Sequence, residues 1–229
     1  KYKGDHNLKI KIFADGADLN TILTDYNNPM IGGFTTNPTL MKKDGVKNYE
    51  EFAKRILDTV KIKPVSFEVI SDNFETMKEQ ALKLSSWGGN VYVKIPITNT
   101  KGESSLSLIK WLSEHGVKIN VTAITTLSQV LHVSEVLKNT TISIISVFAG
   151  RIADTGVDPV LIMEESAEII RRFPLQQLLW ASTREVYNLV QAEQCGCDII
   201  TVPPEIIKKI PLIGKSLDEY SLETVQMFY

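Results

Sequence analysis

Lys94 stands in the run "VYVKIPIT" (residues 91–98), whose β-branched and aromatic residues are typical of a buried strand. An ammonium group is costly to bury unless it is paired. Lys94 could therefore be a surface residue whose head reaches water, a structural ion-pair partner, or a nucleophile. A lysine held in apolar surroundings can attack a carbonyl as an amine, because desolvation favours its uncharged form.

Other apolar runs also carry polar residues near their ends. Successive side chains of a strand point to opposite faces, so the apolar and polar positions of each run can be assigned to different faces. Besides Lys94, the residues assigned to the polar face are Asp15, Thr35, Asn37, Glu68, Asn120, Thr122 and Ser182. A lysine could form a covalent adduct with a carbonyl substrate while the carboxylates Asp15 and Glu68 carry protons.

No metal site is predicted among the histidines. His6, His115 and His132 lie far apart and form no spacing typical of metal ligands. The covalent chemistry outlined above needs no metal, so the two observations agree.

The elements that would position these residues alternate along the chain. Eight β-branched runs are separated by helical patterns with apolar residues at i, i+3 and i+4. This alternation predicts parallel βα units, and eight units indicate an α/β fold with a single closed (β/α)8 TIM barrel. An open doubly wound sheet would share the pattern. The 229 residues fit one barrel domain over 1–229, with a short leader (1–8) and a C-terminal helix (214–229).

Catalytic groups of parallel barrels collect at the C-terminal ends of the strands, and the polar residues named above stand near those ends. A barrel mouth is polar in any case because it meets solvent, and this explains part of the set. It does not readily explain a lysine and two carboxylates that come from three separate strands. The pattern therefore favours an active site at the mouth of the barrel.

Composition excludes several classes of protein. The net charge of −2 gives no electrostatic footprint for nucleic acid or an anionic membrane, and no apolar run is long enough to span a membrane. Cys195 and Cys197 are too few for a disulfide framework, which favours a reducing, cytoplasmic setting. Their "CGC" precedes the eighth run, so we expect buried thiols at the bottom of the barrel, with a redox pair as the alternative.

Eight motifs appear in the same order as in the transaldolase family, and they most resemble its short subfamily, which includes fructose-6-phosphate aldolases. The motifs are "FADGADL", "GFTTNPTL", "SFEVIS", "VYVKIPIT", "INVTAI", "FAGRIAD", "ASTRE" and "TVPPEII". "TTNP" followed by "VKIP" is specific in combination. The resemblance implies a (β/α)8 barrel, class I aldol chemistry through a Schiff base without a cofactor, and phosphorylated sugars as substrates.

The same resemblance implies roles for individual residues. Lys94 matches the lysine that forms the Schiff base, and Asp15 matches the aspartate that takes and returns the C4 hydroxyl proton. Glu68 and Thr122 match the pair that orients a catalytic water. The matched substrate-binding positions are Asn37 at the dihydroxyacetone moiety with Thr35 in the same motif, and Arg151, Ser182 and Arg184 at the phosphate. The forked donors of arginine suit a phosphate dianion, although either arginine could instead form a surface ion pair or mark a helix start.

Two positions distinguish the reactions within the family. By resemblance, transaldolases have a glutamate at the water and a phenylalanine near it, whereas aldolases that release free dihydroxyacetone tend to have glutamine and tyrosine. Glu68 and Phe148 therefore favour a transaldolase. Such an enzyme moves dihydroxyacetone from fructose 6-phosphate or sedoheptulose 7-phosphate to an aldose phosphate, as in the pentose phosphate pathway. A fructose-6-phosphate aldolase and a non-catalytic sugar-phosphate-binding barrel are the alternatives.

Some features depart from the family pattern or extend it. Gly16 replaces the usual hydroxyl residue after the aspartate, and Trp180 is bulky for the inward position that we predict for it. Both changes would reshape the sugar pocket. In the short subfamily the C-terminal helix often packs on a neighbouring subunit, so the resemblance also implies a ring-shaped homo-oligomer.

Overall fold

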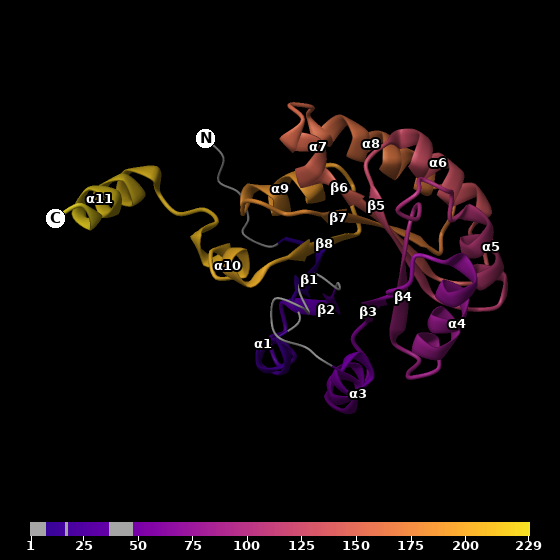
Figure 1. Cartoon of the computed structure of the whole chain (residues 1–229). Coiled ribbons are helices and arrows are strands. Elements are labelled where there is room, and N and C mark those ends of the chain that lie inside the picture. The colour runs from indigo at the N-terminus through magenta and orange to yellow at the C-terminus, as the bar shows by residue number, and fades with distance from the viewer. Residues whose placement is uncertain (1–7, 17, 37–47) are drawn as a thin grey trace.

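Eight parallel strands form the centre of the protein (Figure 1). The structure is a computed structural model that describes residues 8–16, 18–36 and 48–229. The strands are β1 (Lys11–Asp15), β2 (Ile31–Thr35), β3 (Val65–Glu68), β4 (Val91–Pro96), β5 (Ile119–Ile124), β6 (Ser143–Phe148), β7 (Gln176–Ala181) and β8 (Ile199–Val202). They pair in chain order, and β8 pairs with β1, so the sheet is closed. The predicted (β/α)8 barrel is confirmed and the open-sheet alternative is wrong.

Most helices follow a strand and pack on the outside of the barrel. They are α1 (Leu19–Asp25), α3 (Tyr49–Thr59), α4 (Phe74–Ser85), α5 (Leu106–Glu114), α6 (Leu127–Val136), α7 (Ala149–Asp154), α8 (Pro159–Ile170), α9 (Tyr187–Gln194), α10 (Pro204–Ile207) and α11 (Leu217–Met227), with a 3-10 helix at Ile210–Leu212. Side chains cap several of them: Asn73 accepts a hydrogen bond at the start of α4, and Thr126 with Gln129 forms a capping box on α6. The short α7 and α10 were not predicted, because such short helices show no period.

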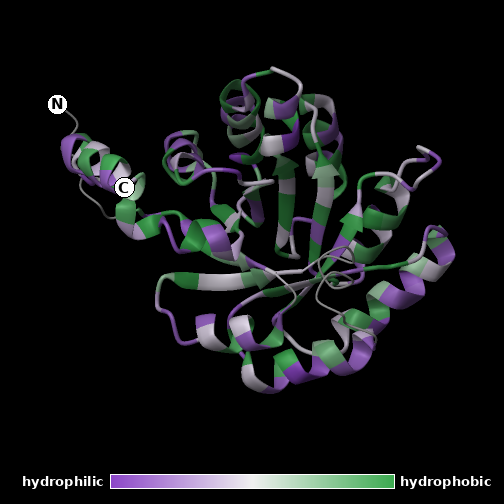
Figure 2. Ribbon diagram, turned by 60° about the vertical axis from the view of Figure 1, so that its left-hand side comes forward, coloured by the Kyte–Doolittle hydropathy of each residue, from purple (hydrophilic) through white to green (hydrophobic). Residues whose placement is uncertain are grey.

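Alternation along the strands separates the two sides of the barrel wall. On β1, Ile12 and Ala14 pack in the larger apolar cluster under the helices, whereas Phe13 belongs to a smaller cluster inside the barrel. On β4, Val93 lies in the outer cluster and Tyr92 in the inner one. Figure 2 shows strands that are mostly hydrophobic. Along the helices, hydrophobic and hydrophilic residues alternate, as expected for helices buried on one side only. The predicted faces of β1 and β4 are confirmed.

The predicted face of Trp180 is wrong. Its indole packs with Leu178 in the outer cluster, whereas Leu179 and Ala181 face the interior. The prediction extended the alternation of β7 back from Ser182, but Ser182 lies beyond the strand and has a left-handed backbone with φ of 61°. The alternation therefore ends at Ala181, and Trp180 does not face the barrel interior.

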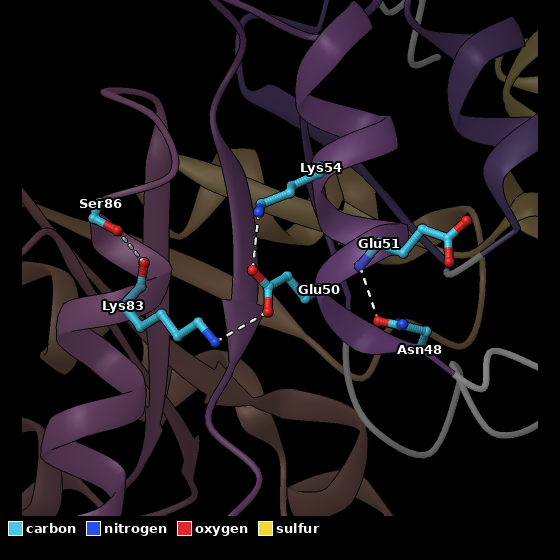
Figure 3. A network of polar contacts seen from close by, with 6 residues as sticks. All are labelled: Asn48, Glu50, Glu51, Lys54, Lys83 and Ser86. Carbon is cyan, nitrogen blue, oxygen red and sulfur yellow. Dashed lines mark hydrogen bonds and ion pairs between the residues drawn. The ribbon is translucent and has the colours of Figure 1, made fainter.

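Polar contacts join α3 to α4, the helices that precede and follow β3 in the chain. Glu50 of α3 contacts Lys54 of the same helix, with 2.9 Å between Oε1 and Nζ, and Lys83 of α4, with 3.0 Å between Oε2 and Nζ (Figure 3). Asn48 accepts a hydrogen bond from the Glu51 amide and so caps α3. Exposed ion pairs of this kind contribute little to stability. Their effect is to link the two helices beside the strand that carries Glu68.

The two cysteines lie at the opposite end of the barrel from the strand carboxyl ends. Cys195 follows α9 and Cys197 precedes β8, and both thiols are free and buried. Burial raises the pKa of Cys195 to about 11 and also raises the pKa of Cys197. Because the thiolate is the reactive form, burial disfavours reaction of either thiol, and the predicted buried position at the bottom of the barrel is confirmed.

The part of the chain that the structure describes contains no helix with both the length and the apolar character needed to cross a membrane.

Helix α11 lies apart from the barrel. Both ribbon views show it at the end of a connecting segment, away from the other helices (Figures 1 and 2). None of its residues is buried, and Leu217, Leu222, Val225 and Met227 are largely exposed. Most helical stability in proteins comes from packing an apolar face. The barrel of its own chain leaves the apolar surface of α11 uncovered.

Candidate active site

Most of the residues predicted to do chemistry lie at one rim of the barrel. Asp15, Thr35 and Glu68 are the last residues of β1, β2 and β3, and Phe148 is the last residue of β6. Lys94 lies within β4, in register with Glu68. Because the strands are parallel, their C-terminal ends meet at the same rim, where barrel enzymes place their active sites.

Lys94 is 7% exposed. Its Nζ donates a hydrogen bond to the backbone carbonyl of Thr36, at 3.0 Å. Glu68 is the register partner of Lys94 on the neighbouring strand, and the positive charge of Lys94 acts to lower the pKa values of both Asp15 and Glu68. Of the three interpretations of Lys94, the surface side chain is wrong. The structure holds this amine by one backbone carbonyl, close to two carboxyl groups.

Burial dominates the titration of Asp15. Loss of solvent raises its pKa, while the Lys94 charge and a 3.1 Å hydrogen bond from Thr35 Oγ1 to Asp15 Oδ1 oppose that rise. The carboxylate of Glu205, at the start of α10, raises the pKa of Asp15 further. A carboxyl with a raised pKa is better matched to proton transfer near neutral pH. Asp15 can therefore serve both as a proton acceptor and as a proton donor.

Glu68 is the second carboxyl group beside the amine. Burial raises its pKa and the Lys94 charge opposes the rise. Tyr49, at the start of α3, donates its hydroxyl proton to the Glu68 backbone carbonyl at 2.8 Å. Burial raises the pKa of Tyr49, so its hydroxyl keeps the proton for this bond. Helix α3 is thereby fixed to the end of β3.

Thr122 stands where β5 is irregular. The pairing with β6 shifts between Val121 and Ile124, and Ala123 has a left-handed backbone with φ of 64°. Bulges of this kind redirect side chains and are frequent beside active sites. The buried Thr122 Oγ1 has no hydrogen-bond partner among the described residues. Because an unpaired buried hydroxyl is costly, this group is suited to bind a water or a substrate oxygen.

A polar network lies deeper in the barrel. Asn120 pairs in register with Lys94, which confirms its predicted inward position. Its Nδ2 donates to Ser66 Oγ at 3.1 Å, and its Oδ1 accepts from Ser146 Oγ at 2.6 Å. These bonds join β3, β5 and β6 inside the barrel and satisfy all three polar side chains, as burial requires. The network supports the strands around the amine.

A close contact between α7 and the end of β7 forms another part of the rim. A methyl group added at Gly150 would lie 1.9 Å from the Ser182 carbonyl oxygen and 2.8 Å from Arg184 Nε, so only glycine allows this approach. Arg184 bonds Asp154 Oδ2 at 2.9 Å, which leaves further N–H groups on its guanidinium. Arg151 of α7 is exposed and forms no ion pair with the described residues. Two guanidinium groups therefore stand on or beside α7.

A cavity of about 260 Å³ adjoins Asp15. Its lining residues are Ala14, Asp15, Gly16, Asp18, Thr21, Ile22, Asp25, Pro203, Pro204 and Glu205. A methyl group added at Gly16 would meet no atom within 4 Å. The absence of a side chain at Gly16 therefore enlarges the space beside Asp15.

Two further predicted positions complete the set. Phe148 is partly buried and packs against the apolar cluster inside the barrel, next to the start of α7. Asn37 lies outside the described residues.

Sequence analysis missed several contributors to the site. Thr201 shares the inward face of β8 with Ile199, so extending the alternation to the eighth run would have found it. Thr36 contributes its backbone carbonyl, which accepts from Lys94. Gly150 contributes because it has no side chain, which lets α7 approach Ser182 closely. No pattern of side-chain types signals the latter two roles.

Comparisons with known proteins agree with this geometry. The sequence profile of the family described as Transaldolase/Fructose-6-phosphate aldolase matches residues 12–228. "Probable transaldolase 2" of Listeria monocytogenes is 33% identical over 215 residues, which cover 92% of this chain and 94% of that protein. "Probable transaldolase" of Thermoplasma acidophilum is 34% identical over 204 residues, which cover 88% of this chain and 87% of that protein.

A solved structure shares the architecture. The crystal structure of a proposed fructose-1,6-biphosphate aldolase from Coccidioides immitis matches with a TM-score of 0.58 at 11% identity. The match covers 91% of this chain and 80% of the other. At this identity the likeness supports the barrel fold alone.

Proposed function

The chain belongs to the transaldolase/fructose-6-phosphate aldolase family, and from this premise we propose that it is a transaldolase acting through a Schiff base on Lys94. The donor would be fructose 6-phosphate or sedoheptulose 7-phosphate, and the acceptor erythrose 4-phosphate or glyceraldehyde 3-phosphate. The observation that carries the proposal is the buried Lys94 amine beside two carboxyl groups whose pKa values are raised by burial. A desolvated lysine suits nucleophilic attack on a carbonyl, and the neighbouring carboxyl groups can exchange the protons that the reaction requires.

In the proposed reaction, the Lys94 amine attacks the ketose C2 carbonyl to give a carbinolamine, which loses water to form the protonated Schiff base. The Asp15 carboxylate then accepts the C4 hydroxyl proton as the C3–C4 bond breaks. The bonding electrons pass into the iminium and leave an enamine, while the aldose phosphate departs. The enamine C3 next attacks the acceptor aldehyde, and Asp15 returns its proton to the new hydroxyl. Hydrolysis of the Schiff base releases the product ketose.

We assign the water steps to Glu68 and Thr122. Loss and addition of water at C2 need a group that exchanges a proton and a group that orients the water. The raised pKa of Glu68 suits the first task. The unpaired Thr122 Oγ1 suits the second.

Binding of the substrate is assigned to other parts of the rim. Arg151 and Arg184, with Ser182, would hold the phosphate, since they gather around α7 at the end of β6 and β7. Thr35, which bonds Asp15, and Asn37 of the same motif would hold the dihydroxyacetone moiety. We propose that residues 1–229 form one catalytic domain, and that the enzyme works in the cytoplasm, in the pentose phosphate pathway.

The competing function is an aldolase that releases free dihydroxyacetone. Glu68 and Phe148 favour the transaldolase by the family resemblance, and Glu68 lies beside the amine as that role requires. Release of glyceraldehyde 3-phosphate from fructose 6-phosphate separates the two. Without an acceptor we expect a burst that is no larger than the amount of enzyme, because the three-carbon unit stays on Lys94. With erythrose 4-phosphate we expect continuous turnover.

Continuous release without an acceptor would identify an aldolase. No release under either condition would contradict both activities on this donor, and the non-catalytic barrel would then be favoured.

We further propose that the enzyme is a homo-oligomer in which α11 packs on a neighbouring copy. The exposed apolar residues of α11 support this, since a single chain leaves them uncovered. We expect the full chain to sediment as an oligomer, and the double variant Leu222→Ser, Val225→Ser to sediment near the 25.6 kDa of one chain. Analytical ultracentrifugation measures both masses.

The matched control for this prediction is Gln226→Ser. Gln226 lies on the polar side of α11 with Glu219 and Glu223, at helical spacing. This control should keep the mass of the full chain. A monomeric full chain, or an unchanged mass in the double variant, would contradict the proposed interface.

A further inference from the structure

A chain of hydroxyl groups links Asp15, at the end of β1, to a threonine of β2 and from there to a threonine of β8. Thr35 Oγ1 of β2 donates to Asp15 Oδ1 at 3.1 Å, and the same Oγ1 is in short contact with Thr201 Oγ1 of β8. β2 and β8 are the two neighbours of β1 in the barrel. The two threonine hydroxyls therefore meet inside the barrel, beside the strand that ends in Asp15.

The number of protons fixes the direction of this chain. A threonine hydroxyl has one proton to donate and can accept with its lone pairs. Since Thr35 gives its proton to Asp15, the contact between the two threonines requires Thr201 to donate. Within the described residues, Thr201 Oγ1 has no other hydrogen-bond acceptor. The chain thus runs in one direction, towards the carboxylate.

The surroundings keep these hydroxyls in place. Thr35 is 2% exposed and Thr201 is 6% exposed, so water does not readily replace either. The Phe13 ring is in register with Thr201 and approaches Gly33 of β2, where an added methyl group would lie 2.7 Å from ring atoms. The aromatic ring therefore packs over Gly33, inside the barrel. Thr183 fixes the backbone of Thr201 by donating from Oγ1 to its carbonyl at 2.7 Å.

We propose that Thr201 is a positioning residue for Asp15, because its hydroxyl donates to Thr35 and so commits the Thr35 proton to the Asp15 carboxylate. This inference rests on the proposed function, in which ionised Asp15 accepts the C4 hydroxyl proton. Without Thr201, the Thr35 hydroxyl could rotate away from Asp15. The carboxylate would then lose a donor that favours its charged form.

Several other charges face Asp15. Lys94 of β4 favours the ionised form, whereas Glu205 of α10 disfavours it. Asp18 and Asp25 line the adjoining cavity. These groups stay in place in a Thr201 variant, so a change in its titration reports on the hydroxyl chain alone.

The test compares Thr201→Val, which keeps the shape, with Thr201→Ser, which keeps the hydroxyl. In Thr201→Val we expect the acid limb of kcat/KM for fructose 6-phosphate cleavage to move up by about half a pH unit to one unit, the size of one hydrogen bond. At a pH below that limb the rate should fall roughly fivefold. Thr201→Ser should restore the wild-type profile. A merely structural role of Thr201 would lower the rate without moving the limb.

Thr141→Val is the matched control. It removes another buried threonine hydroxyl, bonded to the Ser113 carbonyl at 3.0 Å, at the opposite end of the barrel. Its pH profile should be that of the wild type. Thr201→Ala replaces Thr201→Val if the valine variant does not fold.

A second measurement does not depend on activity. Carbon-13 NMR of the Asp15 carboxyl group, assigned by its loss in Asp15→Asn, should show a higher titration midpoint in Thr201→Val than in the wild type. Equal midpoints, with equal acid limbs, would overturn the inference even if the enzyme is a transaldolase. A raised midpoint in an enzyme without transaldolase activity would instead support the hydroxyl chain and contradict the proposed function.

Discussion

The Lys94→Met protein should lose transaldolase activity by at least about a thousandfold, because the covalent step has no other nucleophile among the groups assigned to the site. Borohydride reduction in the presence of fructose 6-phosphate should add the mass of the reduced adduct at Lys94 in the wild type and none in the variant. Removing a buried charge in favour of an apolar side chain is often neutral or stabilising. We therefore expect the variant to melt no earlier than the wild type.

Lys118→Met is the control for this variant. Lys118 lies before β5 at the other end of the barrel, where its Nζ donates to the Gly89 carbonyl at 2.7 Å. The same substitution there should leave turnover and trapping unchanged. Turnover near the wild-type level in Lys94→Met, or a trapped adduct on another lysine, would refute the covalent mechanism.

Asp15→Asn should separate the two halves of the reaction. The amide cannot accept the C4 hydroxyl proton, so cleavage should fall by about 10² to 10⁴, the usual contribution of a general base. Schiff-base formation at Lys94 should persist, because the water steps are assigned to Glu68 and Thr122. Borohydride trapping and glyceraldehyde 3-phosphate release, measured side by side, test both statements.

The pH dependence gives a second signature of Asp15. Cleavage needs the ionised carboxylate, and burial raises the Asp15 pKa. Wild-type cleavage should therefore decline as the pH falls through this raised pKa, and the residual activity of Asp15→Asn should lack that decline. Asp198→Asn is the control, because its oxygen can still accept from the Leu178 amide at the bottom of the barrel. An Asp15→Asn protein with full cleavage would refute the assigned role.

The fold could be predicted because it follows from periodicity. Each β-branched run formed its strand, and the longer helical patterns formed helices, since burial of one face determines both periods. Alternation also identified the inward faces of Lys94, Glu68 and Asn120 correctly. It failed at Trp180, because the inward positions of β7 were assigned by alternation from Ser182. The left-handed backbone of Ser182 ends that alternation.

The composition of the site could be predicted only in part. Side chains on the inward face of a strand can be read from the pattern, and Thr201 could have been included on that basis. The Thr36 carbonyl that holds Lys94 and the approach of α7 to Ser182 over Gly150 depend on how distant segments pack. The direction in which burial shifts the pKa values of Asp15 and Glu68 likewise requires the closed barrel. Sequence therefore identified candidate groups, but not the contacts that prepare them for reaction.

The barrel closes between β1 and β8, where Lys11 is the register partner of Ile199. Pairings between residues so far apart in the chain are slow to form, because closing a long loop costs conformational entropy before any contact is gained. Asp15 is the last residue of β1, and the hydrogen bonds through Thr35 lead to Thr201 of β8. Asp15 and these hydroxyl groups therefore lie where β1 and β8 pair. An intermediate with β2 to β7 assembled would hold the amine, yet it would lack an ordered proton acceptor for cleavage. Under the proposed function, we expect a chain in which β1 has separated from β8 to lose cleavage before it loses most of its secondary structure.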